Sequence, residues 1–298
     1  MPEALLSPEL EGKCECLLRI LLALKSVAVA FSGGIDSTVV ANAAHLALGD
    51  GAVAVTADSP SVPRAEIAEA VELARCIGIR HRLVATQEFG DPDYVRSDGA
   101  RCYFCKDELY SQIETLLPEL GVNAICSGAN LDDLGDYRPG LKAAAEHAVR
   151  HPLQEAGFTK AEVRALARAW DLPIWDKPAS PCLSSRVAPG VEVTPERTAR
   201  IDAAEAYLKS LGLRECRVRL HEGELARIEV PVAELPRLAE ADVRERLVAR
   251  LKQLGFTFVA LDLEGFRSGS LNTLIPLEKQ RLHISSEKTT AGVIGPRR

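Results

Sequence analysis

The 298-residue sequence lacks any long hydrophobic run. Its longest candidate, residues 20–31, is interrupted by Lys25 and Ser26 and falls short of the ~20 apolar residues that a membrane-spanning helix needs. The first residues also lack the basic segment and the apolar stretch that are typical of a secretory signal peptide. The sequence therefore predicts a cytoplasmic protein that does not enter a membrane.

The chain is also short of positive charge. Its 42 Asp and Glu residues outnumber its 36 Lys and Arg residues and leave a formal net charge of −6. This balance disfavours binding to nucleic acid through bulk electrostatics, because a phosphate backbone attracts a basic surface. With 47% hydrophobic and 26% charged residues, the composition is that of a globular protein. We expect a small molecule, and no nucleic acid, as the partner.

Short apolar segments alternate with helical patterns through most of the chain. Strands are predicted at residues 27–31, 52–57, 81–86 and 124–127. Helices are predicted between them at residues 38–48, 64–77 and 106–117. Such alternation is typical of parallel sheets with right-handed crossovers. The sequence therefore predicts an α/β fold, with a parallel sheet flanked by helices.

The pattern changes after a segment rich in proline and serine at residues 176–189. A helix (195–211), two strands joined by a short turn (215–221 and 225–230), a helix (232–254) and a strand (256–263) follow. They predict a smaller α+β domain that contains a hairpin. We place the α/β domain at residues 1–188, a C-terminal domain for substrate binding or oligomerisation at 189–275, and a flexible tail at 276–298.

A glycine-rich turn lies between the first predicted strand and the next helix. Two adjacent glycines let the backbone turn tightly, so that successive N–H groups converge on one point. The N-terminus of the following helix also favours an anion there. Asp36 would repel a bare phosphate, so its expected role is to hold Mg²⁺ between phosphates. The turn predicts a pyrophosphate site made of Ser32, Gly33, Gly34, Asp36 and Ser37.

The ordered string Ser-Gly-Gly-x-Asp-Ser is more specific than a pair of glycines. It is neither the Gly-x-Gly-x-x-Gly fingerprint nor a Walker loop. It resembles the PP-loop of the ATP pyrophosphatases, which cleave ATP to AMP and pyrophosphate. Adenosine is expected across the carboxyl ends of the strands, which adds Ala57 and Gly128 to the ATP site. Asp132 is the expected second ligand of Mg²⁺.

The chain has eight cysteines and no secretory signal, which indicates a reduced protein. Five of the cysteines lie in apolar patterns, where a small buried hydrophobic side chain is the expected role. These are Cys14, Cys16, Cys76, Cys126 and Cys216.

The other three cysteines lie among polar, aromatic or proline residues. Cys102 and Cys105 are separated by two residues at a predicted helix N-terminus, a position that lowers the pKa of a thiol. Cys182 follows Pro181, with Arg186 nearby. Three thiols suit a [4Fe–4S] cluster that keeps one iron open. A zinc site would need a fourth ligand, and no histidine neighbours these motifs.

Five motifs follow one another in order, at residues 32–37, 101–106, 127–140, 176–186 and 217–221. Together they resemble the LarE family, the ATP-dependent sulfur transferases that make the nickel-pincer nucleotide cofactor of lactate racemase. The resemblance runs from about residue 20 to residue 275.

The resemblance implies that a carboxylate of pyridinium-3,5-biscarboxylic acid mononucleotide is adenylylated at the PP-loop. Sulfur then displaces AMP and leaves a thiocarboxylate. Some members consume a cysteine at the position of Cys182, whereas others hold a [4Fe–4S] cluster with three cysteines. This sequence resembles the second type, with Cys102, Cys105 and Cys182 as ligands. The resemblance also implies a homo-oligomer and a separate sulfide donor.

A site for the substrate phosphate is predicted in the second domain. The period of two in residues 217–221 puts Arg217 and Arg219 on one face of a strand. A pair of arginines clamps phosphate well. Ser185 and Arg186 join the pair if the preceding segment folds back onto the strand.

Three other functions remain open from the sequence. A tRNA-thiolating PP-loop enzyme can combine the same loop with three cluster cysteines, although the acidic balance of the chain disfavours it. An amide-forming synthetase that uses ammonia would not need the three cysteines. A non-catalytic module would bind an adenine nucleotide and release no pyrophosphate.

Overall fold

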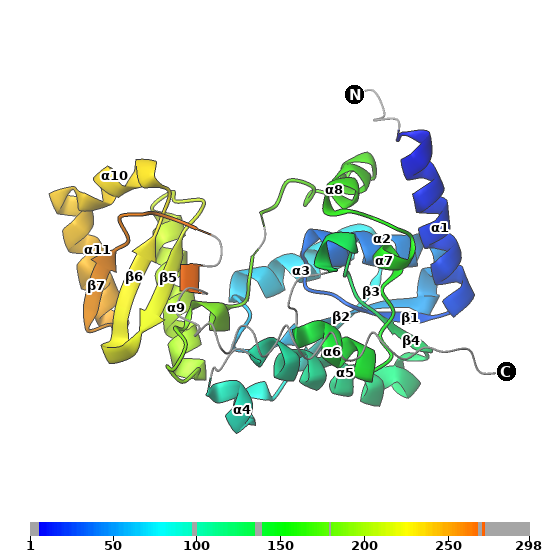
Figure 1. The fold of residues 1–298 in the computed structure, drawn as a ribbon, viewed down its shortest axis with the longest axis horizontal. Coiled ribbons are helices and arrows are strands. Elements are labelled where there is room, and N and C mark those ends of the chain that lie inside the picture. The colour runs from blue at the N-terminus through cyan, green and yellow to red at the C-terminus, as the bar shows by residue number, and fades with distance from the viewer. Residues whose placement is uncertain (1–5, 97–99, 135–138, 179, 268–269, 272–298) are drawn as a thin grey trace. The chain divides into compact units, whose positions relative to one another are not determined.

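The computed structural model describes residues 6–96, 100–134, 139–178, 180–267 and 270–271 (Figure 1). The chain forms two compact units. The first contains Met1–Asp91 and Cys102–Cys182, and the second contains Pro92–Arg101 and Leu183–Arg298. The last boundary between the two units along the chain lies between Cys182 and Leu183. The sequence pattern predicted this boundary at residue 188. The tail expected at residues 276–298 lies outside the described residues.

The first unit is built on a parallel sheet, as predicted. Its strands stand in the order β3-β2-β1-β4, and every neighbouring pair is parallel. In the register, Val27 pairs with Ala52 on one side and with Ala124 on the other. The strands are β1 (Val27–Ala30), β2 (Ala52–Asp58), β3 (Arg80–Ala85) and β4 (Ala124–Cys126).

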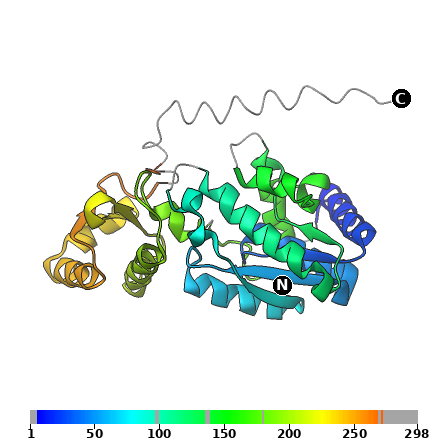
Figure 2. The same cartoon turned by 90° about the horizontal axis from the view of Figure 1, so that it is seen from below.

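Helices cover both faces of this sheet (Figures 1 and 2). One face packs against α1, α2, α3 and α8, and the other packs against α5 and α6. Side chains along a strand point to opposite faces in turn, so Val27 and Val29 enter the first core while Ala28 and Ala30 enter the second. The helices are α1 (Pro8–Leu24), α2 (Ile35–Leu48), α3 (Arg64–Ile77), α5 (Arg101–Leu120), α6 (Pro139–Glu146), α7 (Pro152–Glu155) and α8 (Lys160–Ala169).

The second unit has its own sheet, in the order β5-β6-β7. The predicted hairpin is confirmed, because β5 and β6 are antiparallel neighbours, and β7 adds a parallel strand. The elements are α4 (Pro92–Val95), α9 (Pro195–Ser210), β5 (Arg217–His221), β6 (Leu225–Glu229), α10 (Leu235–Ala239), α11 (Ala241–Gln253) and β7 (Phe258–Leu261).

The prediction of a single helix at residues 232–254 is wrong. The backbone is extended at Glu240 (φ −55°, ψ 137°), which ends α10 and begins α11. Leu238 and Leu247 would lie on opposite sides of one straight helix, at about 100° per residue. The break allows both side chains to be buried.

Two further sequence expectations change in the structure. Cys76, expected to be buried, is exposed on α3, whereas Cys126 and Cys216 are buried as expected. The helix expected from residue 106 begins at Arg101, so α5 contains both Cys102 and Cys105 near its N-terminus. Among the described residues, no helix is long and apolar enough to span a bilayer.

A buried ion pair ties the start of the second unit to its helix α9. The side chains of Arg186 and Glu205 are 1% and 3% exposed. Arg186 donates from Nε to Glu205 Oε1 (3.0 Å) and from Nη2 to Oε2 (3.2 Å). Glu205 Oε1 also accepts the backbone N–H of Val218 in β5 (3.1 Å). One carboxylate therefore joins three elements of this unit.

Glu205→Ala should lower the free energy of unfolding of the second unit by about 3–5 kcal/mol, because it leaves a buried guanidinium without its counter-charge. Urea denaturation of the full chain measures this loss. Glu215→Ala, at an exposed position before β5, is the control and should change stability by less than about 0.5 kcal/mol. Equal effects of the two substitutions would contradict the assignment.

Candidate functional site

The glycine-rich loop lies between β1 and α2 in the first unit. Gly33 has a left-handed backbone (φ 68°), and a Cβ there would lie 3.1 Å from Cβ of Ala70 in α3. Gly34 precedes α2 as its N-cap. Glycine at position 33 is therefore required both by the backbone conformation and by the close approach of α3.

Hydroxyl groups hold this loop in shape. Ser37 Oγ accepts the N–H of Ser32 (3.2 Å) and donates to the carbonyl of Gly34 (3.0 Å). The N–H of Gly34 donates to Ser32 Oγ (3.3 Å). Ser32, Gly33, Gly34 and Ser37, all predicted as ATP-binding residues, thus form one hydrogen-bonded turn ahead of a helix N-terminus. Such a turn suits an anion.

The loop after β4 packs directly against the first turn of α2. A Cβ on Gly128 would lie only 2.6 Å from the backbone nitrogen of Ser37 and 2.8 Å from the carbonyl carbon of Asp36. No other residue fits there without displacing the loop. Ala57 lies near the carboxyl end of β2, the neighbour of β1 on its other side. The structure thus puts the predicted residues from three adjacent strands at one edge of the sheet.

Asp36 is held by two donors. Asn130 Nδ2 donates to its Oδ1 (3.1 Å), and Lys160 Nζ forms an ion pair with its Oδ2. The backbone N–H of Lys160 donates to Oδ2 of Asp132 (3.0 Å). Lys160 therefore connects the two carboxylates that were predicted to bind Mg²⁺.

Sequence reasoning missed the functional potential of Lys160. Thr159 and Glu162 form a capping box at the start of α8, a pattern that indicates only where a helix begins. Nothing in the local sequence places the lysine next to Asp36, which lies 124 residues earlier.

Cys102 and Cys105 lie near the N-terminus of α5, three positions apart and thus on one side of the helix. Burial raises the pKa of the Cys105 thiol well above its ordinary value, and the neighbouring Cys182 and Glu88 raise it further. The expected lowering of thiol pKa at a helix N-terminus is therefore wrong for Cys105. Desolvation and nearby negative charge outweigh the helix dipole here.

The segment that ends at Cys182 is anchored to α3. Lys177 Nζ lies 2.6 Å from Glu69 Oε2, and the hydroxyl of Ser180 donates to Glu66. Across the described ranges, no three or more His, Cys, Asp or Glu side chains are grouped so that they could hold a metal ion. The three thiols are close enough to interact electrostatically without forming a closed set of ligands.

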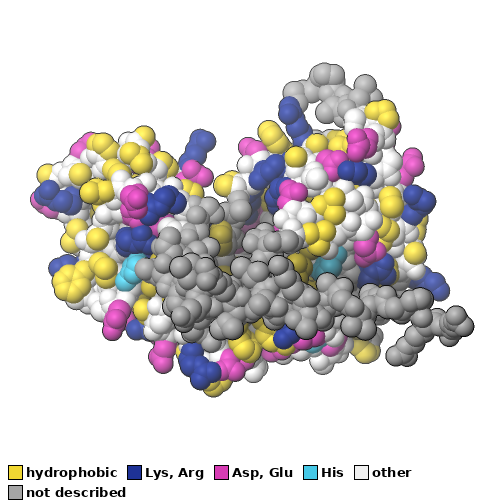
Figure 3. Space-filling model, in the orientation of Figure 1, with side chains coloured by type: hydrophobic (Ala, Val, Ile, Leu, Met, Phe, Trp, Pro, Cys, Tyr) yellow, Lys and Arg dark blue, Asp and Glu magenta, His cyan; other side chains and the backbone are white. Residues whose placement is uncertain are grey.

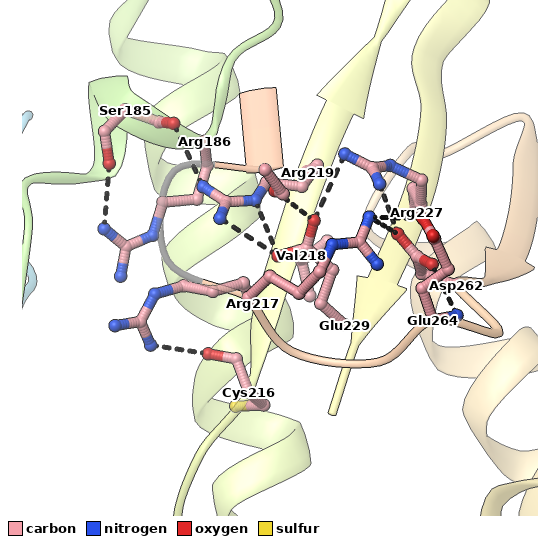
Figure 4. A network of polar contacts seen from close by, with 12 residues as sticks. Ser185, Arg186, Cys216, Arg217, Val218, Arg219, Arg227, Glu229, Asp262 and Glu264 are labelled. Carbon is pink, nitrogen blue, oxygen red and sulfur yellow. Dashed lines mark hydrogen bonds and ion pairs between the residues drawn. The ribbon is translucent and has the colours of Figure 1, made fainter. Parts of the chain in front are cut away.

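The second unit gathers the predicted phosphate ligands (Figure 4). Arg219 donates from Nε to Glu229 Oε2 (3.0 Å) and from Nη1 to the carbonyl of Ser185 (3.2 Å). Arg186 Nη1 donates to the hydroxyl of Ser185 (3.2 Å). Ser185 and Arg186 therefore lie against β5 beside the strand arginines.

Positive charge is concentrated at this cluster. Arg217 donates to the carbonyl of Cys216 (2.7 Å) and lies over the ring of Phe266 at 5.1 Å. Burial lowers the pKa of Arg217, and the neighbouring charges of Arg186 and Arg219 lower it further. Guanidinium groups that repel one another in a partly buried place are suited to an anionic ligand, which relieves the repulsion.

Comparisons with known proteins identify relatives along nearly the whole chain. An uncharacterized protein of Synechocystis is 45% identical over 266 residues, which cover 89% of this chain and 99% of the relative. An uncharacterized protein of Methanocaldococcus jannaschii is 24% identical over 244 residues, 82% of this chain and 92% of the relative. No protein-family model matches the chain.

A relative with a named activity is the pyridinium-3,5-bisthiocarboxylic acid mononucleotide synthase of Lactiplantibacillus plantarum. It is 40% identical over 265 residues, which cover 88% of this chain and 95% of that enzyme. Such identity over almost the full length of both proteins shows that the chain belongs to the family of this synthase, the LarE family that its motifs predicted.

Proposed function

We propose that this protein is an ATP-dependent sulfur transferase of nickel-pincer cofactor synthesis. It adenylylates a carboxylate of pyridinium-3,5-biscarboxylic acid mononucleotide, releases pyrophosphate, and replaces AMP by sulfur to give a thiocarboxylate. The observation that carries the proposal is the 40% identity to the Lactiplantibacillus plantarum synthase over 88% of the chain. The bisthiocarboxylic acid in the name of that synthase requires this replacement at both carboxylates of the substrate, with one AMP and one pyrophosphate released each time.

We assign ATP binding to the loop of residues 32–37, with Ala57 and Gly128 at the neighbouring strand ends. Pyrophosphate gains negative charge as its bond to the α-phosphorus breaks. Loop N–H groups and the N-terminus of α2 stabilise that charge, because they are already oriented before the reaction. The ammonium of Lys160, held at Asp36 in the same cluster, adds a positive charge, so we assign it to the leaving pyrophosphate.

Asp36 and Asp132 are the proposed ligands of Mg²⁺. Carboxylate oxygens are the ligands that this ion takes in proteins, and both side chains contact Lys160, one through Nζ and the other through the backbone N–H. We propose that Mg²⁺ binds at these two carboxylates, beside the phosphates. When bound, the ion neutralises phosphate charge.

We assign the phosphate of the pyridinium substrate to the second unit, at Ser185, Arg186, Arg217 and Arg219. Arg186 and Arg219 are already oriented by Glu205 and Glu229. Their guanidinium groups therefore lose little conformational entropy when an anion binds.

The sulfur atom is assigned to the region of Cys102, Cys105 and Cys182. Three thiols that interact electrostatically supply soft ligands suited to a [4Fe–4S] cluster with one open iron. The described side chains do not converge on a metal position. We propose the cluster, and a separate sulfide donor that loads it, as the source of sulfur.

The surface favours a small-molecule substrate over tRNA. On the described surface in Figure 3, lysine and arginine side chains are interspersed with acidic ones, and the whole chain carries a net charge of −6. A tRNA-binding enzyme would need an extended basic face.

We also propose that the protein assembles as a homo-oligomer, as the family resemblance implies.

The complete reaction is tested with purified protein, ATP, Mg²⁺ and pyridinium-3,5-biscarboxylic acid mononucleotide. AMP and pyrophosphate should appear in equal amounts, and mass spectrometry should detect a thiocarboxylate. Release of AMP only when tRNA or ammonia is added would favour one of the alternative functions. Absence of AMP with every acceptor would overturn the proposal.

Lys160→Met should lower the rate of pyrophosphate release roughly 100-fold, which is typical for loss of one preorganised group at a developing charge. Lys209→Met, at an exposed position on α9, is the matched control and should retain the wild-type rate. A single-turnover assay with labelled ATP separates this chemical step from product release. Equal rates in the two variants would remove Lys160 from the mechanism.

Cys182→Ser should abolish thiocarboxylate formation while a first turnover of pyrophosphate release persists, because the thiol is needed only after adenylylation. Cys76→Ser, which replaces an exposed thiol on α3, should behave as wild type. Anaerobically purified wild-type protein should carry about four irons per chain. A loss of one H₂S from Cys182 after turnover, with no iron bound, would instead identify a consumed cysteine.

A further inference from the structure

Hydrogen-bonding side chains cross the sheet of the first unit, from its edge strand to the nucleotide loop. Thr56 on β2 lies between His81 on β3 and Phe31, the residue that follows β1. Its Oγ1 is 2.7 Å from the carbonyl oxygen of Phe31 and 2.9 Å from Nε2 of His81. Phe31 directly precedes Ser32, the first residue of the loop.

The direction of each bond follows from counting protons. A carbonyl only accepts, so the single hydroxyl proton of Thr56 is donated to Phe31. Thr56 must then accept from His81, which places the ring proton on Nε2. Burial lowers the pKa of His81, so the ring is neutral at pH 7 and its Nδ1 carries no proton.

Packing holds these groups in place. Thr56 and Phe31 are 3% and 2% exposed. The rings of Phe31 and His81 meet edge to face, with centroids 5.9 Å apart. The N–H of Phe31 donates to the carbonyl of Val55 (2.8 Å), so the chain is fixed on both sides of this residue.

The consequence for the loop comes from the planarity of the peptide bond. The carbonyl of Phe31 and the N–H of Ser32 belong to one planar unit, so the direction of one sets the direction of the other. Thr56 holds the carbonyl end of this unit, and Ser37 Oγ accepts from its N–H end at 3.2 Å. A side chain of β2, Thr56, therefore helps to set the direction of the first N–H of the loop. A side chain of β3, His81, in turn holds Thr56.

We propose that His81 and Thr56 are positioning residues for ATP binding, because they fix the peptide unit whose N–H is donated to Ser37 and thereby hold the nucleotide loop in its shape. The proposal rests on the proposed use of ATP by this loop. His81 acts only through Thr56, since its ring proton fixes the hydroxyl that holds Phe31.

Four single variants and one double variant of the full-length protein separate this role from a purely structural one. Thr56→Val removes the hydroxyl at almost constant volume, and His81→Phe removes the donor while keeping an aromatic ring against Phe31. His81→Gln keeps an N–H donor. The control is Thr115→Val, because Thr115 also donates to a backbone carbonyl (Ser111, 3.0 Å) but on an exposed turn of α5.

Three kinds of measurement are made on each variant. Calorimetry gives the Kd of a non-hydrolysable ATP analogue and, separately, the Kd of the pyridinium substrate. The amide chemical shift and hydrogen-exchange rate of Ser32, taken without ligand, report the orientation of the loop. The midpoint of thermal unfolding reports stability.

Thr56→Val and His81→Phe should each weaken binding of the ATP analogue about tenfold, the effect of roughly one hydrogen bond. Both should also shift the Ser32 amide resonance, and neither should change the Kd of the pyridinium substrate. His81→Gln should restore most of the affinity. The double variant Thr56→Val/His81→Phe should bind no more weakly than Thr56→Val alone, because the two residues act in series. Thr115→Val should match wild type throughout.

Two results would overturn the inference while leaving the proposed function intact. One is wild-type affinity for the ATP analogue, with an unchanged Ser32 amide, in Thr56→Val. The other is a loss of affinity for both ligands in proportion to a fall in thermal stability, which is the signature of a structural role. Failure of the wild-type protein itself to bind the analogue would overturn the proposed function, and this inference with it.

Discussion

The parallel pairing of β1 with both β2 and β4 is the constraint on which the rest of the first unit depends. Parallel strands end at the same edge of a sheet, so the loops that follow them meet there. This convergence brings Gly128 so close to the first turn of α2 that a single Cβ would collide with the backbone. The nucleotide loop is therefore shaped by two neighbouring strands as well as by its own glycines.

Opposite charges hold the candidate functional side chains in both units. Asp36 is paired with Lys160, Arg186 with Glu205, and Arg219 with Glu229. Removing a charge from water has a high cost unless a partner compensates for it. These pairs keep the charged groups oriented inside the protein.

Much of the fold was predictable because its determinants are local. Apolar periods and glycine stops located the strands and helices of the first unit, and the short turn at residues 222–224 located the hairpin. The break at Glu240 was not predictable, because it depends on the burial of both Leu238 and Leu247 in the folded protein. The pKa of Cys105 was predicted in the wrong direction, since the local motif contains the helix N-terminus and omits the burial and the approach of Cys182.

By itself the sequence determined which chemical groups are available. These are a loop whose N–H groups converge on one point, three thiols outside apolar patterns, and arginines two positions apart on a strand. Only the tertiary structure decided which partners hold these groups, such as Lys160 at Asp36, Glu205 at Arg186, and the path from His81 through Thr56 to Phe31. The physical reason is the separation along the chain between the residues that interact. Turns and periodicity arise among residues a few positions apart, whereas ion pairs and buried hydrogen bonds form between residues that meet only when the sheet is assembled.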